Sequence, residues 1–232
     1  MRRVAGGCLG PSRSPGLASA RGRAEHALSE SIRPSGGGVR MTQLIVGLCL
    51  FLGIHSVSIV APMQRDQWVE RFGLWTWKAA YGAIALAGFL LIWSGYSLAR
   101  LEPTLLYVPP AGLRHVSALL MLPVFPLLLA AYLPGRISEI AKHPMLVAIK
   151  LWALAHLLAN GMLADVLLFG SLLAWAVADR ISLKYRPSRA NPRAPAWRFN
   201  DVLVVGLGLA LYVHFVTQAH LRLFGVAPFS MG

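Results

Sequence analysis

The residues best suited to chemistry lie in one apolar stretch near the middle of the chain. Lys142-His143-Pro144 precedes this stretch, His156 lies inside it, and Asn160-Gly161 ends it. Another histidine, His55, interrupts an earlier apolar run. A polar group in hydrocarbon is costly unless it is paired, so an ionisable residue at such a position indicates a functional site. Because neutral imidazole is the commonest metal ligand in proteins, we interpret His55 and His156 as candidate ligands to a metal or to a haem iron.

The partner of His156 is open on the sequence alone. From the helical rise, His156 lies about 18 Å from the cytoplasmic end of its predicted helix, and His214 lies about 20 Å from that end of its own. His55 lies only about 9 Å from the corresponding end of its helix. Depth therefore pairs His156 with His214, but helix tilt shifts such positions by about a turn, so His55 stays a candidate. The plainer alternative for His55 is a hydrogen bond to a neighbouring helix.

The pair Lys142-His143 lies where a helix is predicted to begin. Pro144 suits the first position of a helix, which places His143 at the N-cap. Unpaired backbone N–H groups and the helix dipole favour an anion there, and Lys142 adds a positive charge. We interpret the pair as a site for a small anion, a haem propionate or a lipid phosphate. The alternative is an ordinary turn at the membrane surface with a snorkelling lysine. For His115, at the outer start of another predicted helix, a solvated side chain is the simpler interpretation.

The composition is that of a membrane protein. Hydrophobic residues make up 56% of the chain and charged residues 13%, with a mean hydropathy of +0.58; soluble domains are about a quarter charged. Several apolar runs are long enough to cross a bilayer. The net charge of +13 lies in an N-terminal leader and in loops, so it indicates no nucleic-acid partner. We predict an all-α, polytopic transmembrane helical bundle whose main partner is the lipid bilayer.

The apolar runs predict about six membrane spans. They cover residues 43–61, 78–99, 114–133, 144–160, 162–179 and 201–219. The fourth and fifth are short, are separated at Asn160-Gly161, and are interpreted as one helical hairpin, with Asp165 capping the second helix. Pro123 and Pro126 interrupt the third span. Small residues, namely Gly82 with Gly88 and Gly170 with Ala174, are weak indications of close helix contacts.

The positive charges predict the orientation of the spans. Eleven Lys and Arg residues lie in the first, third and fifth loops, and three lie on the other side. The positive-inside rule therefore places the odd loops in the cytoplasm and both termini outside. Residues 1–40 carry seven arginines and no apolar run, which predicts disorder and excludes a secretory signal peptide. An outside N-terminus would have to carry these arginines across the membrane, so we expect Met41 to be the natural start, with residues 41–232 forming the membrane domain.

These residues together give the chain a family resemblance. Over about residues 42–225 the chain resembles the NnrU family. The matching features are His55-Ser56, the Glu70-Arg71-Phe72 region, Lys142-His143-Pro144-Met145, Trp152-Ala-Leu-Ala-His156 with Asn160-Gly161, and the charged segment from Ala178 to Arg186. The resemblance implies a multi-pass protein of the bacterial inner membrane, associated with nitrite and nitric oxide metabolism in denitrifying bacteria.

The family is in turn similar to the zeta-carotene isomerase of plants and cyanobacteria, a membrane enzyme that binds haem b. Its haem histidines match His55 and His156, and its His-Pro motif matches Lys142-His143-Pro144. The resemblance therefore implies haem b as cofactor and prefers His55 over His214 as the partner of His156. The isomerase has a cysteine three residues before its second haem histidine, where this chain has Ala153. This departure puts the isomerase activity in doubt.

Four functions compete at this stage. The first is a haem-binding protein of nitrite and nitric oxide metabolism, with a nitrogen oxide or a hydrophobic small molecule as ligand. The second is a haem-dependent cis-trans isomerase of a polyene such as zeta-carotene. The third is a membrane methyltransferase, because such enzymes carry an Arg-His-Pro motif before a span, although the continuation after Pro144 differs. The fourth is a structural membrane protein. The sequence contains no HExxH motif, Gly-rich phosphate loop or Ser-His-Asp order, which leaves hydrolysis and nucleotide chemistry poorly supported.

Overall fold

A computed structural model describes residues 36–186 and 193–228 of the chain. The chain divides into two compact units, Met1–Val39 and Arg40–Gly232, and the fold described here is that of the second unit. Its described residues form helices and no β-strand, apart from an isolated antiparallel bridge between Leu105 and Met162. The all-α prediction is thus confirmed. Of the predicted leader, residues 1–35 lie outside the described residues, and a helix begins at Gly36.

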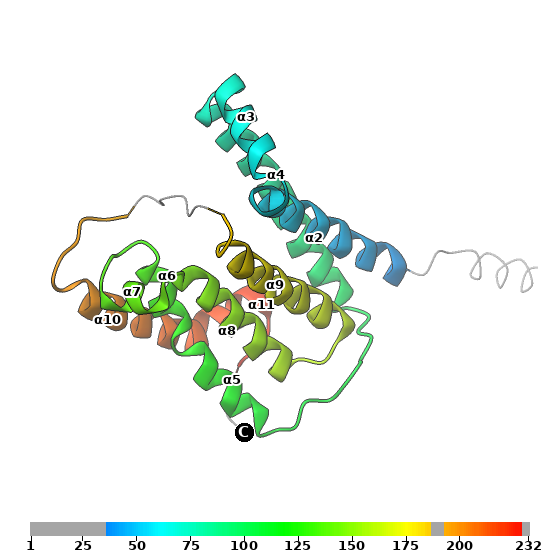
Figure 1. The fold of residues 1–232 in the computed structure, drawn as a ribbon. Coiled ribbons are helices and arrows are strands. Elements are labelled where there is room, and N and C mark those ends of the chain that lie inside the picture. The colour runs from blue at the N-terminus through cyan, green and yellow to red at the C-terminus, as the bar shows by residue number, and fades with distance from the viewer. Residues whose placement is uncertain (1–35, 187–192, 229–232) are drawn as a thin grey trace, which may run out of the picture. The chain divides into compact units, whose positions relative to one another are not determined.

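Most helices follow one another with short connections, but longer segments join α4 to α5 and α9 to α10, as Figure 1 shows. In chain order they are α2 (Gly36–Val60), α3 (Pro62–Phe72), α4 (Leu74–Ala99), α5 (Leu113–Met121), α6 (Val124–Ala130), α7 (Arg136–Ala141), α8 (Pro144–Ala159), α9 (Leu163–Ser182), α10 (Asn200–His214), the π-helix η1 (Phe215–Ala219) and α11 (His220–Phe224). The short helices α3 and α7 lie in segments that the sequence analysis had assigned to loops.

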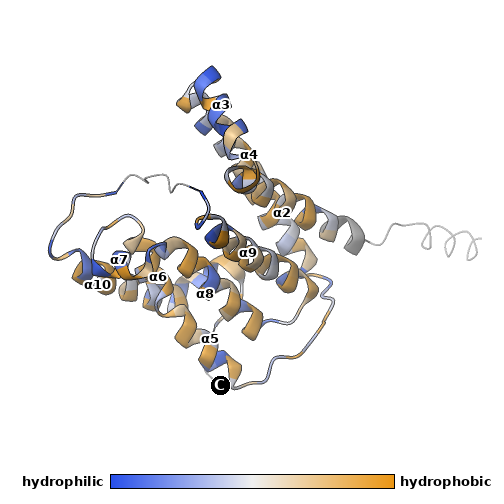
Figure 2. Ribbon diagram, in the orientation of Figure 1, coloured by the Kyte–Doolittle hydropathy of each residue, from blue (hydrophilic) through white to orange (hydrophobic). Residues whose placement is uncertain are grey.

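Four helical segments are long and apolar enough to cross a membrane. They are Met41–Val60, Leu74–Ala99, Leu113–Ala130 and Asn200–Phe224, and at most 22% of each apolar window is buried inside the protein. Apolar residues colour these helices orange in Figure 2, whereas α3 is largely hydrophilic. Apolar surface on this scale would be a liability in water, because soluble proteins rarely expose large contiguous apolar patches. The outward faces therefore fit a lipid environment.

The predicted count of six spans is not confirmed. Helix α8 is apolar but has only 16 residues, or about 24 Å of helix, which is less than the hydrocarbon thickness of about 30 Å. Helix α9 has 20 residues, but Asp165, Asp179 and Arg180 lie within it. These two helices pack against each other, and α8 also packs against α5 and α6. They are the inner helices around which the others are arranged.

Several local predictions are confirmed. The third predicted span breaks between Met121 and Val124, where Pro123 precedes α6. Helix α8 ends at Ala159 and α9 begins at Leu163, on either side of Asn160-Gly161. The side chain of Asp165 accepts a hydrogen bond from the Met162 N–H, at 3.1 Å, and so caps α9. A further bond of 2.6 Å from the Tyr96 hydroxyl holds the same carboxylate, which is only 2% exposed.

Glycines allow α2 and α4 to approach closely. A Cβ at Gly88 would lie 2.7 Å from the backbone nitrogen of Phe51, and one at Gly95 would lie 2.5 Å from that of Leu44. The prediction of close packing is therefore right for Gly88. It is wrong for Gly82 and Gly170, since a Cβ at either position would meet nothing within 4 Å.

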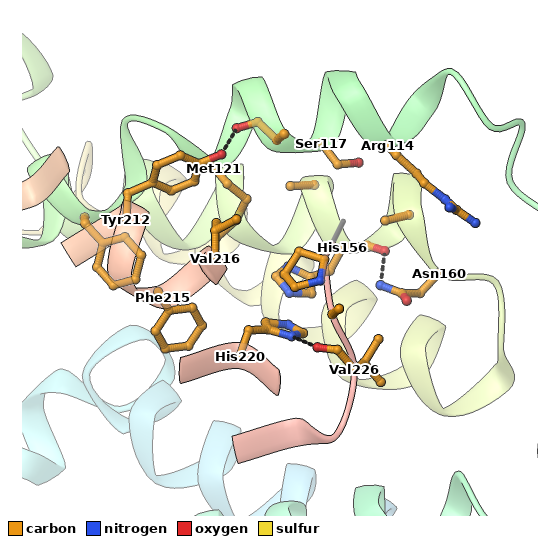
Figure 3. A pocket seen from close by; sticks show the side chains of 16 residues that line it. Arg114, Ser117, Met121, His156, Asn160, Tyr212, Phe215, Val216, His220 and Val226 are labelled. Atoms are coloured by element: carbon orange, nitrogen blue, oxygen red, sulfur yellow. Dashed lines mark hydrogen bonds between the residues drawn. The ribbon is translucent and has the colours of Figure 1, made fainter. Parts of the chain in front are cut away.

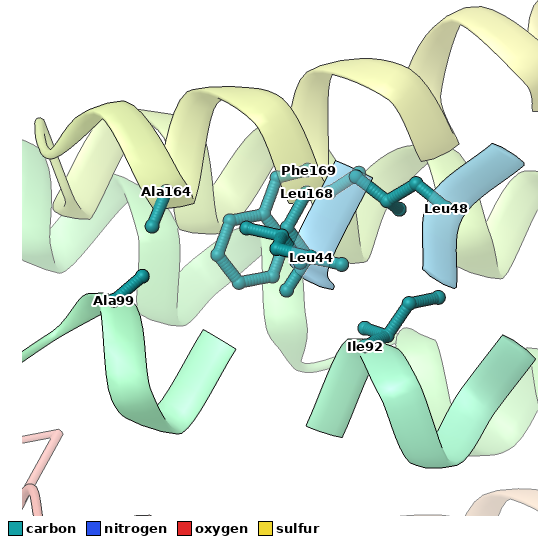
Figure 4. Packing of buried hydrophobic residues seen from close by; sticks show 8 residues of the cluster. Leu44, Leu48, Ile92, Ala99, Ala164, Leu168 and Phe169 are labelled. Atoms are coloured by element: carbon teal, nitrogen blue, oxygen red, sulfur yellow. The ribbon is translucent and has the colours of Figure 1, made fainter. Parts of the chain in front are cut away.

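The contact between α2 and α4 continues into a buried cluster shared with α8 and α9. Figure 4 shows this cluster, formed by Leu44, Leu48, Ile92, Ala99, Ala153, Ala164, Leu168 and Phe169. Phe169 belongs both to this core and to the surroundings of His156. The core thereby fixes the helices that carry the candidate site.

Candidate functional site

A cavity of about 370 Å³ lies between α5, α8, the α10–η1 segment and the residues that follow α11. Its wall is mainly apolar, with Met121, Phe125 and Phe215 among the larger side chains (Figure 3). The polar residues that line it are Arg114, Ser117, His156, Asn160, Tyr212 and His220. An apolar cavity with a few convergent polar groups is the usual form of a small-molecule or cofactor site.

His156 is held by its own helix. Its Nδ1 atom lies 2.8 Å from the carbonyl oxygen of Trp152, one turn earlier in α8. Because a carbonyl oxygen only accepts hydrogen bonds, Nδ1 carries the proton and Nε2 keeps its lone pair. The ring also stacks on Phe169, with the ring centroids 4.5 Å apart. His156 is therefore oriented as metal-binding histidines are, with one nitrogen fixed by a hydrogen bond and the other free to act as a ligand.

His220, the first residue of α11, is held in the same way. Its Nδ1 atom lies 2.7 Å from the carbonyl oxygen of Val226. That carbonyl reaches back because Gly225, at φ 68°, ends α11 in a left-handed conformation that glycine adopts without strain. The sequence pattern alone predicts no role for His220. The only available signal was a histidine five residues before a glycine, which does not reveal that the chain turns back.

Asn160 lines the cavity, and Tyr107 is bonded to it from outside the lining. The Asn160 side chain donates to the carbonyl of His156, at 3.0 Å. The Tyr107 hydroxyl donates to the carbonyl of Asn160, at 2.7 Å, and also to that of Leu157. Burial and the charge of Asp165 raise the pKa of Tyr107, so its hydroxyl stays protonated as a donor. Arg114, exposed at the same side, supplies a positive charge at the rim.

His55 lies in a different cluster. Its Nδ1 atom bonds the Phe51 carbonyl of its own helix, at 2.6 Å, rather than a neighbouring helix as the plainer interpretation had it. Its ring centroid lies 5.2 Å from that of Tyr81 and 5.8 Å from that of Trp175. Like His156, His55 thus has a free Nε2, but it is not among the residues that line the cavity.

The structure does not bring the rings of His55 and His156 into contact. His156 stacks on Phe169 and His55 meets Trp175, both on α9. These two α9 residues are six positions apart, which is about 9 Å along a helix axis. His214, the partner that depth had favoured, is exposed and does not line the cavity either.

Lys142 and His143 form a tight turn far from the cavity. Lys142 has φ 57° and ψ −44°, and the His143 N–H donates to the Ala141 carbonyl, at 2.6 Å, which together define a γ-turn of the rare, strained kind. Pro144 is the first residue of α8 and His143 its N-cap, as predicted. Burial and the Arg180 guanidinium lower the pKa of His143, so its side chain is neutral at pH 7. This turn lies about 20 Å along α8 from His156.

Comparison with the sequence profiles of known families shows which family the chain belongs to. The sequence profile described as NnrU protein matches residues 43–228. The chain belongs to the NnrU family. In this NnrU protein the matched range includes both histidine clusters and the whole lining of the cavity. Comparisons with curated proteins and with solved structures found no match.

The cavity of this NnrU protein combines two kinds of chemistry. Imidazole nitrogens with free lone pairs suit a transition metal or a haem iron. A guanidinium at the rim suits a carboxylate. No carboxylate is among the described residues that line the cavity, so the wall itself offers no paired acids for hydrolysis.

Proposed function

We propose that this NnrU protein binds haem b in the cavity, with His156 as a ligand to the iron, and that it acts in nitrite and nitric oxide metabolism. One observation carries the proposal. The Nε2 lone pair of His156 is left free, by the bond from Nδ1 to Trp152, on the wall of an apolar cavity. The apolar walls suit a porphyrin face, and Arg114 at the rim suits a propionate.

The proposed biological role rests on the family resemblance. Haem supplies an iron that binds nitrogen oxides or exchanges electrons, and the surrounding protein tunes its potential through its ligands and the polarity of the pocket. In the predicted orientation, Arg114 and Asn160 face the outer side of a bacterial inner membrane. A diatomic or apolar ligand would then reach the cavity from that side or from the lipid. Such a site fits sensing or redox chemistry on nitrogen oxides.

Absorption spectra of the detergent-purified protein test the proposal. We expect the wild-type protein, supplied with haem, to show a Soret band, and a pyridine haemochrome assay to identify haem b. His156→Ala should lose most of this band. The matched control is His115→Ala, because His115 is an exposed histidine outside the cavity. A colourless wild-type protein would refute haem binding, and an unchanged band in His156→Ala would refute His156 as a ligand.

His55 is the second ligand that the family resemblance implies. Its free Nε2 keeps it chemically competent for this role. Lys142 and His143, which the resemblance aligns with the isomerase's His-Pro motif, lie at the start of α8 and do not line the cavity. A cofactor role for these two residues would therefore require a separate anionic group at that helix end.

A second candidate is the polyene isomerase, which the apolar wall of the cavity favours. A long hydrocarbon would pack against Met121, Phe125 and Phe215 beside the haem. Against it stands Ala153, which is fully buried in the core where the isomerase has a cysteine. Conversion of a cis-polyene by the reduced holoprotein would support this candidate. Absence of conversion, with haem bound and reduced, would exclude it for the polyene tested.

A further inference from the structure

We propose that His220 would be the second protein ligand to the iron, together with His156. The inference rests on the proposed haem binding and names a ligand that the family resemblance does not. His156 and His220 line one cavity, although they lie 64 residues apart in the sequence. Figure 3 shows His156 on α8 and His220 on the C-terminal segment, both among the side chains that line the cavity.

The first argument is the orientation of the two rings. Each uses Nδ1 to bond a backbone carbonyl, that of Trp152 for His156 and that of Val226 for His220. Each therefore keeps its Nε2 lone pair for a ligand. A hydrogen bond from the other ring nitrogen to a carbonyl is the arrangement that fixes metal-binding histidines in proteins. His156 and His220, which line the same cavity, are therefore two candidate donors for a haem iron.

The second argument is the backbone that positions His220. The π-helix Phe215–Ala219 lies between α10 and α11, and single π-helical turns are rare and frequent at functional sites. The wider turn changes the helix register just before His220. Phe215 and Val216 within this segment line the same cavity as His220. Gly225 then turns the chain so that Val226 fixes the imidazole.

The third argument is the position of the other histidines. His55 contacts Phe51, Tyr81 and Trp175, and it does not line the cavity. His214 precedes the π-helix and is exposed. Within the described residues, His220 is thus the one histidine besides His156 on the cavity wall.

Spin-state spectroscopy of the full-length holoprotein tests this assignment. An iron with two histidine ligands is low-spin, whereas loss of one ligand makes it high-spin. We expect His220→Ala to convert the ferric haem from low-spin to high-spin and added imidazole to restore the low-spin spectrum. The control variants His55→Ala and His214→Ala should keep the wild-type spectrum. A low-spin spectrum in His220→Ala would overturn the proposal, and a high-spin spectrum in His55→Ala would assign the ligand to His55 instead.

A conservative variant separates ligation from folding. His220→Met replaces the imidazole with a thioether side chain of similar size that can also bind iron. If His220 is a ligand, the reduction potential should rise, because a thioether ligand favours ferrous iron relative to imidazole. An unchanged potential would overturn the assignment even if His220→Ala fails to fold. A wild-type protein that binds no haem would refute the proposed function itself, and the two failures are therefore distinguishable.

Discussion

At the scale of single residues, the same hydrogen-bond arrangement recurs at three histidines. His55, His156 and His220 each direct Nδ1 to a backbone carbonyl, at 2.6 to 2.8 Å. For His55 and His156 the carbonyl belongs to the residue four positions earlier in the helix. This pairing satisfies one ring nitrogen within the helix and leaves the other available. An apolar environment thus tolerates the imidazole, because one of its two ring nitrogens is already paired.

Arg114 offers the sharpest test of charge at the cavity. In Arg114→Gln the side chain keeps hydrogen-bonding groups but loses its charge. A charge-assisted hydrogen bond contributes about 1.5–3 kcal/mol, so we expect haem affinity to fall by about 10- to 100-fold. Transfer of haem to excess apomyoglobin measures this change.

The control for Arg114 is Arg100→Gln, which removes a charge from the preceding loop without touching the cavity lining. Equal affinities for the wild type and Arg114→Gln would show that no propionate meets this guanidinium.

Local sequence preferences do not predict the backbone conformation of Lys142. Pro144 at the first helical position and His143 at the N-cap followed from local preferences. The positive φ of Lys142 did not, because lysine has no preference for it. Contacts elsewhere must hold this backbone, and strain of this kind is often found at functional sites.

At the scale of elements, the segment between α4 and α5 is fastened to the turn between α8 and α9. The Leu106 and Tyr107 N–H groups both donate to the Gly161 carbonyl, at 2.8 and 3.2 Å. The Leu163 N–H donates to the Thr104 carbonyl, at 2.8 Å. A Cβ at Gly161 would overlap the carbonyl group of Tyr107. This glycine is therefore required by the close approach of two chain segments.

Gly161→Ala should loosen this end of the cavity. The added methyl group must displace the Tyr107 backbone, and overpacking of this kind costs about 1–3 kcal/mol. We expect a lower thermal midpoint in detergent and weaker haem retention, since Tyr107 also bonds Asn160.

The matched control is Gly170→Ala on α9, where an added Cβ meets nothing within 4 Å. Within a helix, alanine is about 1 kcal/mol more favourable than glycine, so this control should be neutral or slightly stabilising. A thermal midpoint of Gly161→Ala equal to that of the control would contradict the close approach.

At the scale of the whole molecule, the outer faces of the helices carry the apolar surface. Large apolar side chains such as Leu86, Val202 and Leu119 are more than half exposed. The buried core is small by comparison and is concentrated around α8 and α9. These exposed apolar faces fit a lipid bilayer.

The predicted orientation is tested by cysteine labelling in intact cells. In a background without Cys8 and Cys49, Val108→Cys and Ile140→Cys place single thiols at positions that are 75% and 79% exposed. We expect a membrane-impermeant maleimide to label Val108→Cys in intact cells, and Ile140→Cys only after permeabilisation. The reverse pattern would invert the proposed topology.

The sequence by itself determined the long apolar helices and several of their breaks. Local chemistry sufficed to predict these features because they act through neighbours in the chain. They are the apolar runs, Pro123, Pro144, Asn160-Gly161 and the cap at Asp165. His156 was also accessible in this way, because a histidine in an apolar run is unusual wherever the run packs.

Only the tertiary structure decided which side chains share the cavity. His220 depends on a π-helical turn and on Gly225, and the meaning of Gly161 depends on a segment more than fifty residues earlier. Spacing along the chain carries no information on such encounters, since they are set by how separate helices pack. The same reason applies to the packing of α8 against α5, α6 and α9.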